Sequence, residues 1–98
     1  MYTVMNRIPV PAAGAAAFEE RFAVSMRETL HGVPGLVRAR LLRPEQEGGT
    51  YVAVMDFTSA DAFAAWRRSD SFRAAHGPST GGMDAQVETF ETVASVGA

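Results

Sequence analysis

The apolar residues of this chain switch repeatedly between two spacings, and the order of the switches limits the fold more than any other feature. A two-residue spacing is typical of a strand with one buried face, and a three-to-four-residue spacing is typical of an amphipathic helix. From the N-terminus, the spacings predict a strand at 2–10, a helix from 15 to about 30, strands at 36–43 and 51–57, a helix that carries Phe63 and Trp66, a short helix ending near His76, and a strand at 86–93. This order predicts an α+β, ferredoxin-like split βαβ fold (βαββαβ), with both main helices on one face of an antiparallel sheet. Because the chain has 98 residues and no linker-like tract, we expect one domain spanning 1–98.

The first predicted helix has an apolar stripe and a polar side. The stripe consists of Phe18, Phe22, Met26 and Leu30. The residues expected on the solvent side are Glu19, Glu20, Arg21, Arg27 and Glu28. Thr58, with Asp61 three residues later, resembles a capping box and predicts the start of the second helix. Ser69 or Asp70 is expected to cap the short helix that follows.

The strand predicted at 51–57 is apolar on nearly both faces, which has a consequence for assembly. Tyr51, Ala53, Met55 and Phe57 share one face, while Val52 and Val54 share the other. The two helices of this fold cover only one face of the sheet, and a large uncovered apolar patch is unusual in a monomer. We therefore expect a homodimer in which two sheets pack against each other as a dimeric α/β barrel.

The composition excludes several classes of function. The net charge is −2, so nothing favours binding to nucleic acid or to an anionic membrane surface. All nine basic residues are arginine. Cysteine is absent, which excludes disulfides, thiolate metal sites and a cysteine nucleophile. No segment resembles a signal peptide or a membrane span, so we expect a cytoplasmic protein.

Three residues stand out as candidates for chemistry: Asn6, Trp66 and His76. Asn6 places a primary amide among the apolar residues of a strand face, where it serves either as a satisfied core amide or as a donor directed into a pocket. Trp66 is either a packing anchor or the wall of a ligand site. His76 is either a helix-end residue stabilised by the helix dipole or a metal ligand. His31, the other histidine, follows the first predicted helix and is interpreted as a solvated turn residue.

Other kinds of catalytic site do not match the sequence. The two histidines are not at a chelating spacing, no glycine-rich phosphate loop is present, and no serine lies in a nucleophile elbow. By elimination, a scaffold of this kind is expected to obtain its chemistry from a bound molecule.

Over nearly its whole length, the chain resembles the IsdG-type heme-degrading monooxygenases, within the wider antibiotic-biosynthesis-monooxygenase-like group of dimeric α/β barrels. The matching segments are Asn6 with the strand that precedes it, Glu20-Arg21-Phe22, Val33-Pro34-Gly35-Leu36, residues 61–66 ending in Trp66, and residues 71–76 ending in His76. The combination of Asn6, Trp66 and His76 is the most specific of these features, because the Pro-Gly turn is common to the whole group.

The resemblance implies that Asn6, Trp66 and His76 form the catalytic set and that heme is both substrate and cofactor. His76 would be the axial ligand of the heme iron, Trp66 would press on the macrocycle and ruffle it, and Asn6 would donate a hydrogen bond on the oxygen-binding side. Opening of the porphyrin ring would use O2 and electrons from a separate reductase, and would release iron. Phe22 and Phe72 are expected to line the heme site, because both fall on the apolar faces of their helices.

Two alternatives remain open at the level of the sequence. One is a cofactor-free monooxygenase acting on a quinol or polyketide-type phenol in the same fold, with His76 as a general base or a structural residue. The other is a non-catalytic heme-binding protein.

Overall fold

The order of the strands and of the two main helices predicted from the sequence is the one observed. The structure, a computed structural model, describes residues 1–70, 72 and 87–97. The strands are β1 (Tyr2–Ile8), β2 (Leu36–Leu42), β3 (Tyr51–Phe57) and β4 (Val87–Glu91), and the helices are α1 (Ala15–Thr29), α2 (Ala60–Arg67) and a short 3-10 turn, η1 (Ala12–Gly14). The βαββαβ arrangement is thereby confirmed.

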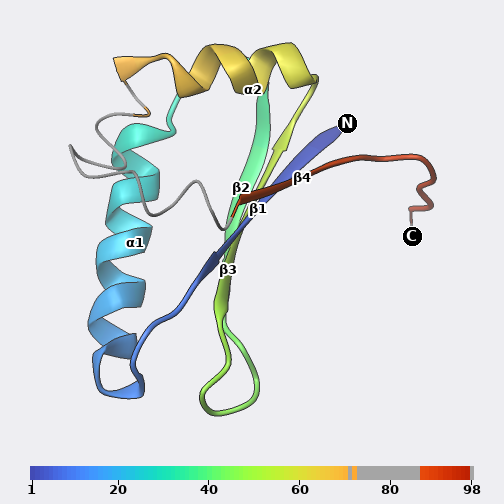
Figure 1. The fold of residues 1–98 in the computed structure, drawn as a ribbon. Coiled ribbons are helices and arrows are strands. Elements are labelled where there is room, and N and C mark those ends of the chain that lie inside the picture. Colours follow the sequence, from blue (N-terminus) through green and yellow to red (C-terminus); the bar gives the residue numbers. More distant parts are fainter. Residues whose placement is uncertain (71, 73–86, 98) are drawn as a thin grey trace.

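The four strands form one antiparallel sheet in the order β2-β3-β1-β4. Both α1 and α2 lie on the same face of this sheet, with α1 running alongside the strands and α2 crossing near one end (Figure 1). In the register of the sheet, Asn6 on β1 lies opposite Ala53 on β3 and Val87 on β4. Asn6 therefore lies on the helix-covered face of a central strand, between two small or branched apolar neighbours.

Several element boundaries differ from those predicted. β1 ends at Ile8 rather than Val10, because Pro9 has no N–H to donate to the ladder. β2 ends at Leu42, and the side chain of Arg43 turns instead to a partner on α1. α1 ends one residue early, at Thr29, and β4 is shorter than the predicted 86–93.

The start of α2 lies one residue later than the capping pattern predicts. Ser59, not Thr58, is the N-cap, and its hydroxyl accepts a hydrogen bond from the Ala62 N–H at 3.1 Å. The backbone N–H of Thr58 is bonded instead to the Gly35 carbonyl, at 2.8 Å, in the turn before β2. This bond holds the beginning of α2 against the beginning of β2.

The core lies under α2, where a cluster of aromatic rings packs on the sheet. Phe57 at the end of β3 is fully buried, and Phe63 and Trp66 on α2 contact it with ring centroids 5.5 and 5.9 Å away. Val4 on β1 completes the cluster. Because this core occupies one end of the helix-covered face, the rest of the space between α1 and the sheet is not filled by it.

The opposite side of the sheet carries no helix, and we call it the open face. Its residues include Thr3, Met5, Val52, Val54, Asp56 and Phe90. Asp56 accepts hydrogen bonds from the Thr3 hydroxyl at 2.6 Å and from the Arg38 guanidinium at 2.9 Å, and both lower the pKa of its carboxyl. The C-terminal segment, residues 92–97, extends away from the sheet on the side opposite α1 (Figure 1).

Neither helix of the described residues combines the length and the apolar character that crossing a membrane requires.

Candidate functional site

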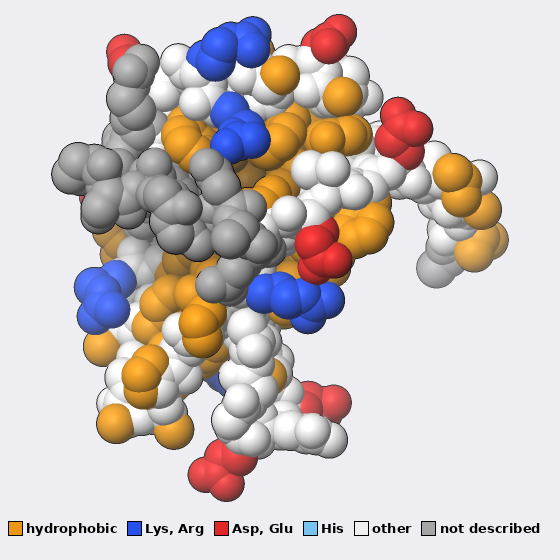
Figure 2. Space-filling view, in the orientation of Figure 1, with side chains coloured by type: hydrophobic (Ala, Val, Ile, Leu, Met, Phe, Trp, Pro, Cys, Tyr) orange, Lys and Arg blue, Asp and Glu red, His pale blue; other side chains and the backbone are white. Residues whose placement is uncertain are grey.

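A cavity of about 430 Å³ lies between α1, α2 and the sheet. Its walls are mainly apolar, and Figure 2 shows hydrophobic side chains gathered in this region between the helices and the strands. The residues with polar side chains in its lining are Asn6, Arg21, Ser25, Thr29, Arg40 and Arg67, of which Arg40 pairs with Val54 and therefore lies on the open face. Among the described residues that line it, none is acidic. The cavity is therefore suited to a largely apolar ligand with neutral or anionic polar groups.

The structure brings four of the five candidate residues into this one cavity. Asn6 comes from β1, Phe22 from α1, Trp66 from α2 and Phe72 from the segment that follows α2, and all four are in its lining. The fifth, His76, lies outside the described residues, as does the loop from Gly77 onward. The role of His76 as a ligand of the heme iron therefore stays a prediction.

Asn6 presents an available amide to an apolar space. Its neighbours on the same face are Val4 along the strand and Ala53 and Val87 across it, none of which carries a polar side chain. Within the described part of the chain, the Asn6 carboxamide takes part in no hydrogen bond. A carboxamide in such surroundings gains about 1 kcal/mol or more from a ligand that accepts its hydrogen bond. This geometry favours the donor interpretation of Asn6 over that of a satisfied core amide.

Trp66 packs against several other aromatic rings. Phe57 lies 5.9 Å away, centroid to centroid, and Phe72 meets the indole edge-on at 4.9 Å. Trp66 is buried, so it is a core residue and a cavity wall at once. The two interpretations of Trp66 are thus not exclusive, because the ring that anchors α2 also forms a rigid wall of the ligand space.

Ser69 orders the chain just after α2. Its hydroxyl donates to the Trp66 carbonyl at 2.6 Å and accepts from the backbone N–H of Phe72 at 3.2 Å. The bond from the Phe72 N–H to the Ser69 hydroxyl is the contact expected of an N-cap, while the short helix predicted to end near His76 falls mostly outside the described residues. The consequence is that Phe72 is turned back toward Trp66.

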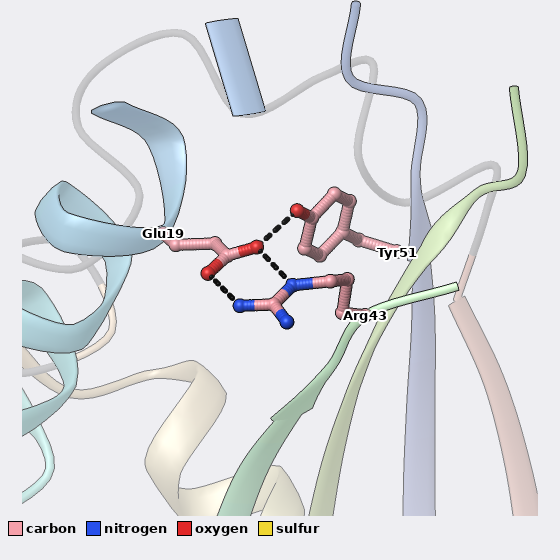
Figure 3. Close-up of polar contacts among 3 residues, drawn as sticks. All are labelled: Glu19, Arg43 and Tyr51. Atoms are coloured by element: carbon pink, nitrogen blue, oxygen red, sulfur yellow. Dashed lines mark hydrogen bonds and ion pairs between the residues drawn. The ribbon is translucent and has the colours of Figure 1, made fainter. Parts of the chain in front are cut away.

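A cluster of three polar residues links α1 to the ends of β2 and β3 (Figure 3). The Glu19 carboxylate accepts two hydrogen bonds from the Arg43 guanidinium, both at 2.6 Å, and one from the Tyr51 hydroxyl. These bonds lower the pKa of Glu19 to about 2 and raise the pKa values of Arg43 and Tyr51. The Tyr51 ring packs edge-on against Phe18 of the cavity wall, with centroids 5.1 Å apart. The cluster therefore fixes the position of α1, and of the cavity wall at Phe18, relative to the sheet.

Two features of this site do not emerge from the sequence patterns. The prediction that Glu19 lies on the solvent side of its helix is wrong, because the ends of β2 and β3 approach that side with Arg43 and Tyr51. No local signal links Glu19 to residues 24 and 32 positions away. The second feature is the presence of Arg67 in the cavity lining. The sequence does contain one indication of it, because Arg67 lies four residues after Phe63 and therefore shares a side of the helix with that residue.

The family-model comparison agrees with this architecture. The model described as "Antibiotic biosynthesis monooxygenase" matches residues 1–78, which is most of the chain. The chain belongs to this family. Its membership is in keeping with the confirmed fold and with monooxygenase chemistry as the general class of activity.

Individual relatives within the family differ in activity. A heme oxygenase (mycobilin-producing) from Mycobacterium tuberculosis is 32% identical over 95 residues, covering 95% of this chain and 90% of the relative. A structure of the heme-degrader MhuD from Mycobacterium tuberculosis, with two hemes bound in its active site, has a TM-score of 0.77 at 29% identity and covers 99% of this chain and all of that one. SnoaB, a cofactor-independent oxygenase from Streptomyces nogalater, was solved as a mutant with a TM-score of 0.72 at 27% identity, covering 97% of this chain and 95% of that one.

Proposed function

We propose that this protein is a heme-degrading monooxygenase that binds heme as both substrate and cofactor in the cavity between the sheet and the helices. The observation that carries the proposal is the meeting of Asn6, Phe22, Trp66 and Phe72 around one apolar space. The similarity to heme oxygenases over nearly the whole chain supports the same substrate.

The residues present suit this substrate. The cavity of about 430 Å³ falls within the usual range for ligand sites, roughly 300–1,000 Å³. Its apolar walls match the flat hydrocarbon surface of a tetrapyrrole, and its arginines match the carboxylates at the edge of that molecule. Bound heme, supplied with electrons by a separate reductase, would provide the activation of O2.

The chain's own residues would position the substrate and exclude water. Trp66, supported by Phe57 and Phe72, would resist displacement and press against a flat ligand. Asn6 would donate a hydrogen bond from the floor of the cavity. His76 would bind the iron, a role that rests on its place in the sequence and on the resemblance.

A titration of the purified protein with hemin tests substrate and ligand together. We expect a saturable shift of the Soret band that His76→Ala abolishes. His31→Ala is the matched control, because His31 is the other histidine of the chain and lies in an exposed loop. A titration with no saturable shift would reject the proposal, and a shift that survives His76→Ala would remove the axial role.

Turnover is tested by adding a reductant to the heme complex. We expect the Soret band to disappear with catalase present, while a ferrous chelator captures the released iron. A stable Soret band under these conditions would instead identify a heme-binding protein without enzymatic activity.

A cofactor-independent oxygenase is the second candidate, and the similarity to SnoaB favours it. In that case the cavity would hold a phenol or quinol directly, with Asn6 as a hydrogen-bond donor to its oxygen. Oxygen uptake with a quinol substrate and no added heme, together with no Soret shift in the hemin titration, would select this function.

We further propose that the protein acts as a homodimer in which a second copy covers the open face. Phe90 on that face is 45% exposed, and Val93 and Val96 in the C-terminal segment are each 96% exposed. Apolar side chains on a sheet face and on an extended segment beside it favour a protein partner, and a second copy would bury both.

A further inference from the structure

The cavity is positively charged at its edges, although the chain as a whole is slightly acidic. The net charge of the chain is −2, yet the charged residues that line the cavity are arginines only, within the part of the chain that is described. Cations bordering a low-dielectric cavity attract anionic ligands and repel cationic ones. The cavity therefore selects ligands that carry a negative group on an apolar body.

Two of the three arginines in the lining, Arg21 and Arg67, come from the helices, and the third comes from the sheet. Arg40 belongs to β2 and lies opposite Val54 on the open face, where it contributes to the lowered pKa of Asp56, so its charge is directed away from the cavity. Arg21 belongs to α1 and Arg67 to α2, so each helix brings one cation to the cavity.

Arg67 differs from Arg21 because aromatic rings hold its guanidinium in place. Its central carbon lies 5.7 Å from the ring centroid of Phe63 and 6.0 Å from that of Phe72. Phe72 also packs edge-on against Trp66, with centroids 4.9 Å apart, so the Arg67 charge and the indole of the cavity wall share this ring as a neighbour. A guanidinium that interacts with rings through its face has N–H groups at its edge, which can bind a carboxylate with two parallel hydrogen bonds. Figure 2 shows basic side chains next to the hydrophobic region along α2.

We infer that Arg67 is a specificity-determining residue that binds a carboxylate at the edge of the flat ligand and so fixes the ligand's orientation in the cavity. The inference rests on the proposed function, in which these carboxylates are the heme propionates. With its polar edge held beside α2, a tetrapyrrole would present a defined part of its ring to Asn6. Arg67 would therefore affect which product forms as well as how tightly the substrate binds.

The test compares hemin with hemin whose propionates have been methylated, using the Soret shift as the measure of binding. We expect Arg67→Gln to weaken hemin binding about tenfold, because one charge-assisted interaction is lost. The same substitution should change binding of the methylated ligand by less than about twofold. Arg67→Lys should show an intermediate loss, because the charge stays but the planar fork is removed.

Arg68→Gln is the matched control. Arg68 is the adjacent exposed arginine at the C-cap of α2 and is not part of the cavity lining, so its substitution should leave both affinities unchanged. Equal weakening of both ligands by Arg67→Gln would mean that only packing on Phe63 and Phe72 was lost, and would overturn the inference while the proposed function stands. If the unaltered protein binds neither porphyrin, the proposed function fails and this inference fails with it.

Discussion

Asn6 is a polar residue whose neighbours on the same face of the sheet carry no polar side chain. Val4, Ala53 and Val87 surround it, and the cavity lies in front of it. Asn6 is partly exposed to the cavity, so its amide is accessible to water or to a ligand that takes the place of that water. A hydrogen bond from this amide to a bound ligand therefore stays a prediction.

The first prediction concerns this residue. Asn6→Ala should leave hemin affinity within about twofold but slow heme breakdown by at least tenfold, roughly the effect of removing one positioned donor. Titration and single-turnover absorbance measurements separate the two quantities. If breakdown proceeds at the original rate in Asn6→Ala, the amide has no part in the reaction.

At the scale of the elements, the site depends on how α1 and α2 are attached to the sheet. The Glu19–Arg43–Tyr51 cluster attaches α1, and the turn containing Gly35 attaches α2. Both attachments lie at ends of strands, so they set the width of the cavity without filling it.

The second prediction concerns Gly35, whose φ of 80° is unfavourable for any residue with a side chain. An added Cβ would lie 2.5 Å from the Ala62 Cβ, so Gly35→Ala would also push α2 away from the sheet. Gly32 is the matched control, because its φ is 74° but an added Cβ would meet no atom within 4 Å. In urea unfolding, Gly32→Ala should cost about 1–2 kcal/mol for the backbone alone, and Gly35→Ala should cost clearly more. Equal costs would show that contact with α2 is unimportant.

The third prediction uses the pKa of Glu19, which is about 2 in the folded protein against an ordinary value of 4.5. A lowered carboxyl pKa stabilises the fold above the ordinary value, and this contribution is lost as the pH falls through the folded pKa. Glu19→Gln should therefore lower Tm at pH 7, and the difference from the unaltered protein should shrink between pH 4.5 and pH 2. The effect should be modest, because solvent screens this partly exposed ion pair.

Glu20→Gln provides the control for that experiment, since Glu20 is the next residue of α1 and is exposed. We expect little change in Tm from it at either pH. A Glu19→Gln deficit that stays constant down to pH 2 would mean that the ionised carboxylate is not what stabilises the cluster.

At the scale of the whole molecule, the two faces of the sheet differ in what covers them. The helix-covered side contains the cavity, and the open face contains a buried acid, Asp56, surrounded by apolar side chains and arginine. A sheet with one such face uncovered is expected to associate, and pairing of two open faces leaves both cavities accessible on the outside of the dimer.

The fourth prediction tests this assembly by light scattering at micromolar concentration. The unaltered protein should have the mass of two chains, and Phe90→Gln should weaken the dimer about tenfold or more by placing an amide in an apolar interface. Val24→Gln is the control, because Val24 is 38% exposed against 45% for Phe90 but lies on α1 rather than on the sheet. A monomeric mass for the unaltered protein would contradict the proposed dimer.

The sequence by itself determined the order of the main elements, the fold, and the strand face that Asn6 shares with Val4 and Ile8. These follow from spacing between near neighbours, because side chains two apart on a strand or three to four apart on a helix share a face wherever the element packs. Trp66, Phe22 and Phe72 could be proposed for the same reason, as apolar residues on predicted helix faces.

Only the tertiary structure decided how distant segments meet. The partners of Glu19 are 24 and 32 residues away, and the rings around Arg67 depend on where the chain after α2 turns back. Such contacts are set by strand register, by the way the helices cross the sheet, and by turns such as the one at Gly35, none of which is encoded in local periodicity. The open cavity arises in the same way, because the aromatic core fills only one end of the space between the helices and the sheet.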